Sequence, residues 1–240
     1  MNQSRLVPAS GEVRIPCGNA WLYGDLFVPL DACALVLFVH GSGSDRHSTR
    51  NRPVAMRLQQ AGIATLLFDL LTAQEAQIDL RRLERRVDVA LLTQRLQDTT
   101  HWVLAQPNLA RLSIGYFGAS TGSTAAIIAA ARLGRQIRAV VTCGGRPDLA
   151  GPVALAAVTA PTLLMVGSAD HGALKLNKYA LLHLGGKKQL AVVDGATCLF
   201  DGHSALEQVA ELAASWFGAY LALTDEDAQT PSTLPGKNLA

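Results

Sequence analysis

The sequence predicts an α/β fold with a mostly parallel, twisted sheet, helices on both faces of that sheet, and an N-terminal antiparallel hairpin. Short continuous apolar runs alternate with helical segments along the chain, and such runs are typical of parallel strands buried on both faces. Residues 12–17 and 21–28 instead alternate apolar with polar positions on either side of Gly18-Asn19. This second pattern indicates a hairpin whose two strands form an antiparallel edge.

The remaining elements follow from the same two patterns. Further strands are predicted at residues 34–39, 63–68, 112–117, 137–143, 162–166 and 189–193. Helices are predicted at residues 53–61, 87–105, 123–133, 173–183 and 205–221. Residues 74–86 are charged and contain four clustered arginines, which indicates a solvated helix with internal Glu–Arg pairs.

The composition favours one globular domain. Of 240 residues, 49% are hydrophobic, which is enough to form a sizeable core over residues 11–221. Residues 1–10 are expected to form an N-terminal extension. Residues 222–240 have almost no large apolar side chains, so we expect a disordered tail there.

Charge and cysteine content narrow the function classes. The 21 basic and 19 acidic residues give a net charge of +2, so no general attraction to nucleic acid or to an anionic membrane is expected. The sequence has no secretory h-region and no apolar run of the ~18–20 residues that a membrane helix needs. The four cysteines lack the short spacing of zinc or redox motifs. We therefore expect a cytoplasmic protein with free thiols that acts on a small-molecule substrate, without metal or organic cofactor; no oligomeric state is predicted.

The strongest chemical motif is Gly118-Ala119-Ser120-Thr121-Gly122, which follows a predicted strand and opens a predicted helix. That context is typical of a nucleophile elbow, in which small residues two positions away let strand and helix approach each other. The helix N-terminus would offer N–H groups to an oxyanion on the substrate. An ordinary glycine-rich turn is the alternative interpretation.

Two further loops complete a candidate catalytic set. His40-Gly41-Ser42-Gly43 follows a buried strand, so the N–H groups of Ser42 and Thr121 are the candidate oxyanion hole, with His40 more structural than catalytic. Asp170 follows another buried strand and is the candidate carboxylate that orients an imidazole; its alternative role is a helix N-cap. The order Ser…Asp…His would then place a histidine after the last strand.

These motifs together resemble the dienelactone-hydrolase-like branch of the α/β-hydrolase superfamily. The resembling stretches are residues 39–44, 46–48, 51–52, 66–71, 115–122, 144–149 and 195–200. The resemblance covers about residues 11–220. It implies the α/β-hydrolase fold and a serine hydrolase that acts on esters or related acyl compounds; some relatives are fused to a phosphoribosyltransferase domain.

The chain departs from this resemblance at Cys198, where relatives carry the catalytic histidine. A thiol cannot accept a proton at one atom while a carboxylate orients it at another, as an imidazole can. His203, five positions later, is the first candidate substitute base. Alternatively, the protein is a weak or non-catalytic binding or scaffold protein. The third possibility is that His47 or His171 is the base, or that Ser120 and Cys198 together perform other chemistry.

Basic residues gather in the loops that should rim the carboxyl edge of the sheet, where open α/β folds bind ligands. The group consists of Arg46, Arg50, Arg52 and Arg146. We expect one or two arginines to contact an anionic substrate group, and Arg46, His47 and Arg146 are the candidate substrate-binding residues. Solubility and ion pairs within the loops are the competing explanation.

Overall fold

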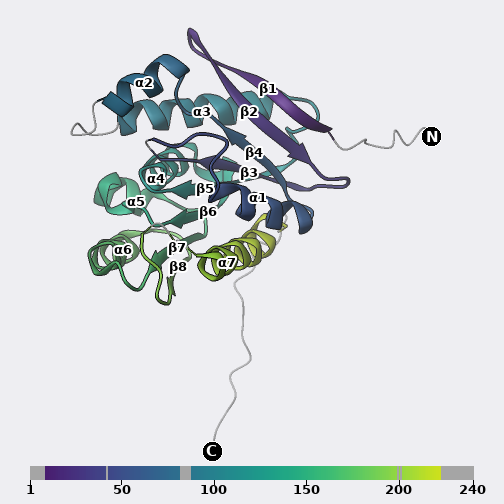
Figure 1. Cartoon of the computed structure of the whole chain (residues 1–240). Helices are drawn as coiled ribbons and strands as arrows, with labels where there is room; N and C mark the ends of the chain where they lie inside the picture. The colour runs from purple at the N-terminus through teal and green to yellow at the C-terminus, as the bar shows by residue number, and fades with distance from the viewer. Residues whose placement is uncertain (1–8, 42, 82–87, 199, 201, 223–240) are drawn as a thin grey trace, which may run out of the picture.

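A computed structural model describes residues 9–41, 43–81, 88–198, 200 and 202–222 (Figure 1). The predicted N-terminal extension and C-terminal tail therefore lie largely outside the described residues. The first strand begins at Ala9, inside the predicted extension.

An eight-stranded sheet forms the centre of the molecule, in the order β1-β2-β4-β3-β5-β6-β7-β8. The strands are β1 (Ala9–Cys17), β2 (Ala20–Val28), β3 (Ala34–Val39), β4 (Ala64–Phe68), β5 (Ser113–Ala119), β6 (Ile137–Cys143), β7 (Thr162–Gly167) and β8 (Lys188–Val193). β1 pairs with β2, and β2 with β4, in antiparallel fashion, and all later pairings are parallel. The predicted fold class is confirmed, including the antiparallel hairpin at the N-terminal edge.

Helices cover both faces of this sheet (Figure 1). The helices are α1 (Asn51–Gln60), α2 (Ala73–Arg81), α3 (Val89–Ala105), α4 (Gly122–Leu133), α5 (Gly151–Ala157), α6 (His171–His183) and α7 (His203–Leu221). α3, α4, α5 and α6 pack on one face and α1 and α7 on the other, so the core has two layers. Across the described part of the chain, no helix is long and apolar enough to span a bilayer.

Strand β5 shows how alternation divides the core between the two faces. Ile114 and Tyr116 belong to the layer under α3 and α4, whereas Phe117 belongs to the layer under α7. Gly115 faces α7 as well, and a Cβ there would lie 2.8 Å from Cε1 of Phe217. The missing side chain therefore lets the Phe217 ring pack directly on the strand.

The charged segment is described only in part, so the predicted Glu–Arg pairs within it stay a prediction. Its described part forms α2, and Glu75 lies 3.1 Å from Arg95 of α3. Arg82, Arg85 and Arg86 lie outside the described residues. The contact with Arg95 joins α2 to α3, so it depends on tertiary structure that helical spacing alone does not reveal.

Parallel strands bring the expected functional loops to one place. β3, β5, β6, β7 and β8 run in the same direction, so the loops after their carboxyl ends meet at one edge of the sheet. Ser120, Asp170 and Cys198 all follow strands at this edge.

Substitution of two helical glycines, one packed against the β3 loop and one in open space, measures how closely the backbone is packed at this edge. A Cβ on Gly122, in the first turn of α4, would lie 2.0 Å from the Val39 carbonyl oxygen, whereas one on Gly218, in α7, would meet open space. We expect Gly122→Ala to lower the free energy of unfolding by about 3 kcal/mol or more. Gly218→Ala should raise it by about 0.5–1 kcal/mol through helix propensity. Urea unfolding of both variants measures the difference, and equal effects would contradict this packing.

Candidate active site

Ser120 lies on a strained turn between β5 and α4. Its φ is +52°, and only Asp31 and Phe200 share a positive φ among the described non-glycine residues. A Cβ on Gly118 would lie 2.8 Å from Cα of Ser123. Small residues on both sides of Ser120 therefore let strand and helix meet, and the serine is left exposed above the sheet. This is the backbone geometry of a nucleophile elbow.

The loop after β3 approaches the same serine. A Cβ on Gly41 would lie 2.8 Å from Cβ and 3.1 Å from Oγ of Ser120, so this close approach requires a glycine. Thr121 directly precedes α4 as its N-cap. Ser42 lies outside the described residues, and its expected role as an oxyanion donor stays a prediction.

His40 connects the loop after β3 to Leu70 through hydrogen bonds. Both of its ring nitrogens are used in these contacts, so neither is free for proton transfer. Its Nε2 accepts a hydrogen bond from the Leu70 N–H at 3.1 Å, so Nδ1 carries the proton and donates to the Gly41 carbonyl at 2.9 Å. Burial lowers the pKa of His40 and thereby favours the neutral ring. The predicted structural role of His40 agrees with these contacts.

Asp170 caps a helix in the position expected of a catalytic carboxylate. It follows β7, and its Oδ1 accepts a hydrogen bond from the Ala173 N–H at 2.9 Å as the N-cap of α6. The N-cap role weighed from the sequence is therefore present. The loop that holds Asp170 also bonds to the loop after β8, because the Ala169 N–H donates to the Ala196 carbonyl at 3.0 Å.

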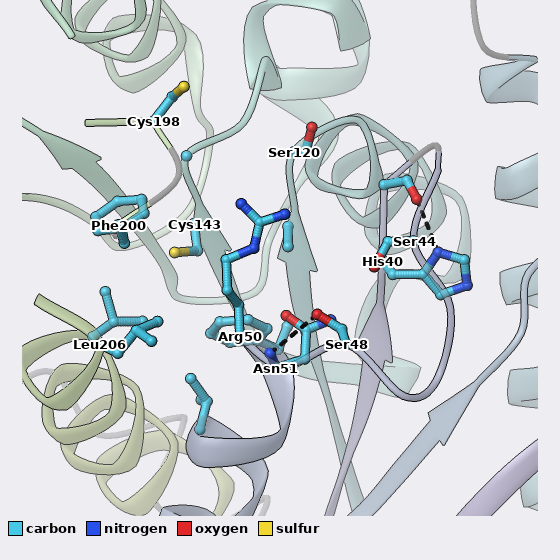
Figure 2. A pocket seen from close by; sticks show the side chains of 16 residues that line it. His40, Ser44, Ser48, Arg50, Asn51, Ser120, Cys143, Cys198, Phe200 and Leu206 are labelled. Carbon is cyan, nitrogen blue, oxygen red and sulfur yellow. Dashed lines mark hydrogen bonds between the residues drawn. The ribbon is translucent and has the colours of Figure 1, made fainter. Parts of the chain in front are cut away.

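Cys198 belongs to this second loop, which is tightly held. The Gly195 N–H donates to Oγ of Ser168 at 2.8 Å, and a Cβ on Gly144 would lie 2.4 Å from the Cys198 carbonyl oxygen. The backbone of Cys198 is thus placed by contacts with the loops after β6 and β7. Its exposed thiol borders the same pocket as Ser120 (Figure 2).

That pocket has a volume of about 130 Å³ and lies between the loops after β3, β5, β6 and β8 and the helices α1 and α7. Its apolar wall consists of Val54, Phe117, Ala119, Phe200, Leu206 and Val209. The polar lining residues are His40, Ser44, Ser48, Arg50, Asn51, Ser120, Cys143 and Cys198. The pocket therefore combines an exposed serine with an apolar chamber, which suits a small, partly apolar ligand.

The candidate substitute bases lie elsewhere. His203 begins α7 with a side chain that is 91% exposed and 3.0 Å from Oε1 of Glu207. His47 accepts a contact from Arg52 at 3.2 Å, and His171 is the first residue of α6. All six histidines of the chain belong to its described part, and among them only His40 lines the pocket. Cys198 thus lines the same pocket as Ser120, whereas His203 is not among the described residues that line it.

The candidate substrate-binding cations are engaged in ion pairs. Arg46 contacts Glu12 at 2.6 Å, Asp69 at 3.0 Å and Asp25 at 3.5 Å, which ties the hairpin to the loop after β3. Arg146 forms two 2.8 Å hydrogen bonds with Asp148. Neither residue lines the pocket, and His47 does not either.

Arg50 and Asn51 line the pocket instead. Arg50 belongs to the basic group seen in the sequence, but no local signal separates it from its neighbours. Asn51 was missed, since the helix was predicted to begin at residue 53 and its first turn lay outside that range. Among the described residues, no three His, Cys, Asp or Glu side chains lie close enough together to bind a metal ion.

The comparisons with known proteins agree with this architecture. The chain is similar to a dienelactone hydrolase from Anabaena variabilis, with 49% identity and a TM-score of 0.86 over 89% of this chain and 99% of that one. Est1E from Butyrivibrio proteoclasticus, at 16% identity and a TM-score of 0.73 over 88% of this chain and 98% of that one, shares the fold alone. No family model matches.

Another similar protein is named as a transferase rather than as a hydrolase. A Mycobacterium tuberculosis protein with the provisional name phosphoribosyl transferase is 52% identical over 206 residues, which are 86% of this chain and 45% of that protein. The chain therefore spans less than half the length of that relative. The near-complete match to the Anabaena enzyme decides the family. The chain belongs to the dienelactone-hydrolase-like branch of the α/β-hydrolase superfamily.

Proposed function

We propose that this protein hydrolyses carboxylic esters or related acyl compounds through an acyl-Ser120 intermediate. The observation that carries the proposal is the exposed Ser120 on its strained turn at the border of a partly apolar pocket. A hydrolase of 49% identity supports the reaction class, and its printed name suggests a lactone as one substrate type. The transferase name of the mycobacterial relative refers to a much longer protein, so the pocket is the better guide.

The reaction would proceed in two acyl transfers. Ser120 Oγ attacks the acyl carbon and loses its proton, while the N–H groups of Thr121 and Ser42 stabilise the oxyanion. The tetrahedral intermediate collapses, the bond to the leaving oxygen breaks, and the alcohol leaves with a proton. Water then attacks acyl-Ser120, which releases the acid and restores the serine hydroxyl.

The weak step is proton transfer. Asp170 would orient a base on the neighbouring loop, but that loop presents Cys198, and the one histidine that lines the pocket has both ring nitrogens engaged. Removal of the base from such a triad costs on the order of 10⁴-fold or more in rate. This arrangement also favours a second candidate function, a binding protein that has the pocket and turns over slowly or not at all.

Covalent labelling with a fluorophosphonate tests whether Ser120 is reactive. We expect the intact mass to rise slowly by one adduct and the adduct to disappear in Ser120→Ala, because the oxyanion hole supports attack on the reagent while no imidazole at residue 198 activates the serine. Ser204→Ala removes an exposed serine on α7 that does not line the pocket, and should label like the parent. A folded parent that stays unlabelled would favour the binding protein.

Restoring an imidazole tests the base position. Cys198→His should raise the hydrolysis rate of p-nitrophenyl acetate at least about tenfold, because the loop already places residue 198 at the pocket. Cys33→His is the matched control, since Cys33 is exposed and precedes β3 at the other end of the strand. His203→Gln should leave the parent rate unchanged. A rate that falls with His203→Gln, or fails to rise with Cys198→His, contradicts this account of the base.

A further inference from the structure

The lysines of this chain gather on one part of its surface. Lys237 lies outside the described residues, and all the other lysines of the chain fall between residues 175 and 188. They are Lys175 and Lys178 on α6 and Lys187 and Lys188 at the start of β8, and all are exposed. Residues 171–193 contain no aspartate or glutamate. The net charge of +2 therefore averages over an uneven distribution, and we call the surface that these four residues share the lysine face.

Carboxylates do not neutralise the lysine face within the described part of the chain. None of its four ammonium groups lies within 4.0 Å of an acidic side chain there. Lys187 lies 5.1 Å from the ring centroid of Tyr220, and Lys188 donates to the Leu184 carbonyl at 2.7 Å, at the end of α6. These contacts hold two of the side chains in place without cancelling their charge.

Apolar side chains project beside these charges. Spacings of three and four residues along α6 place Lys175, Tyr179 and Leu182 in one outward row, opposite the buried Ala180. Leu182 is 77% exposed, and Val153 on the adjoining helix α5 is 83% exposed, the two highest values among the large apolar side chains of the described residues. The lysine face thus combines positive charge with aliphatic side chains that no other part of the described chain covers.

The choice of lysine distinguishes this face from the rest of the structure. Elsewhere, arginines make paired contacts of fixed geometry: Arg57 donates twice to Glu211 at 2.6 and 3.0 Å, and Arg146 donates twice to Asp148 at 2.8 Å. A lysine ammonium is a point charge on a flexible stem, so it suits an extended anionic surface better than one oriented carboxylate. A second copy of the chain docked through the same face would bring like charges together.

We propose that the lysine face binds the surface of an anionic phospholipid membrane. The lysines would contact the headgroups, while Leu182 and Val153 enter the boundary between headgroups and acyl chains. Figure 1 shows α6 and β8 at the periphery, at the opposite end of the sheet from the β1–β2 hairpin, so a flat surface can approach them. This is attachment at the surface only, and it requires no acyl transfer at Ser120.

Co-sedimentation with large unilamellar vesicles tests this binding. The parent should bind phosphatidylcholine vesicles that contain about 30% phosphatidylserine at least about tenfold more tightly than vesicles of phosphatidylcholine alone, and about 0.5 M NaCl should remove most of this difference. Lys175→Gln combined with Lys178→Gln should weaken binding to the anionic vesicles about 10- to 30-fold. Arg14→Gln combined with Arg52→Gln removes an equal charge from the hairpin and α1, and should change binding less than about twofold.

The apolar contribution has its own pair of variants. Leu182→Ser should weaken binding about 3- to 10-fold, whereas Met56→Ser, at a 57% exposed position of α1, should leave it unchanged. All of these side chains are exposed, so the folded state is expected to be retained, and circular dichroism checks it.

Several outcomes would overturn the membrane proposal: no binding by the parent, equal binding to neutral and anionic vesicles, or equal weakening by the lysine and arginine pairs. Lysine-dependent binding to poly-L-glutamate without binding to anionic vesicles would also overturn it, and would assign the face to an acidic protein. Ser120→Ala should bind vesicles as the parent does. A failure of the hydrolase function and a failure of membrane binding are therefore separate results.

Discussion

The close approach of three backbone segments at Ser120 is the constraint on which the rest of the site depends. The end of β5, the start of α4 and the loop after β3 lie against one another at this serine. Their backbones are so close that a Cβ at Gly41, Gly118 or Gly122 would clash with neighbouring atoms. A non-glycine residue with a positive φ persists only where its surroundings hold it there, and this packing does so for Ser120. Residues at and after the ends of β6 and β8 complete the pocket beside this turn, since Cys143, Gly144, Cys198 and Phe200 line it.

Charged residues play different parts outside and inside the pocket. Outside it, Arg46 joins the hairpin, the loop after β3 and the loop after β4 through its pairs with Glu12, Asp25 and Asp69. Inside it, His40 and Cys143 are held towards their neutral forms by burial, and Arg50 carries the charge. The described lining of the pocket thus contains a serine and a positive charge, but no histidine with a free ring nitrogen.

The sequence predicted the fold because the central strands are buried on both faces, so that their apolar runs are continuous and easy to recognise. It also placed Ser120, Asp170 and Cys198 at one edge, since that follows from parallel pairing. It could not separate Arg50 from Arg46, because the partners of Arg46 are brought to it only by the folded hairpin. The exposure of His203 could not be predicted either, because it depends on where α7 begins. The sequence did not reveal α5, because a helix of seven residues is too short to show a helical period.

The central claim is that Ser120 lies in an intact pocket without an imidazole base, and a pH–rate profile tests it most directly. The value of kcat/KM for p-nitrophenyl acetate should be measured between about pH 5.5 and 7.5 in the parent and in Cys198→His. The account predicts a titration near pH 6.5, the ordinary range of histidine, in Cys198→His and none in the parent. A parent that already shows this titration, and loses it together with its activity in Ser120→Ala, would contradict the account.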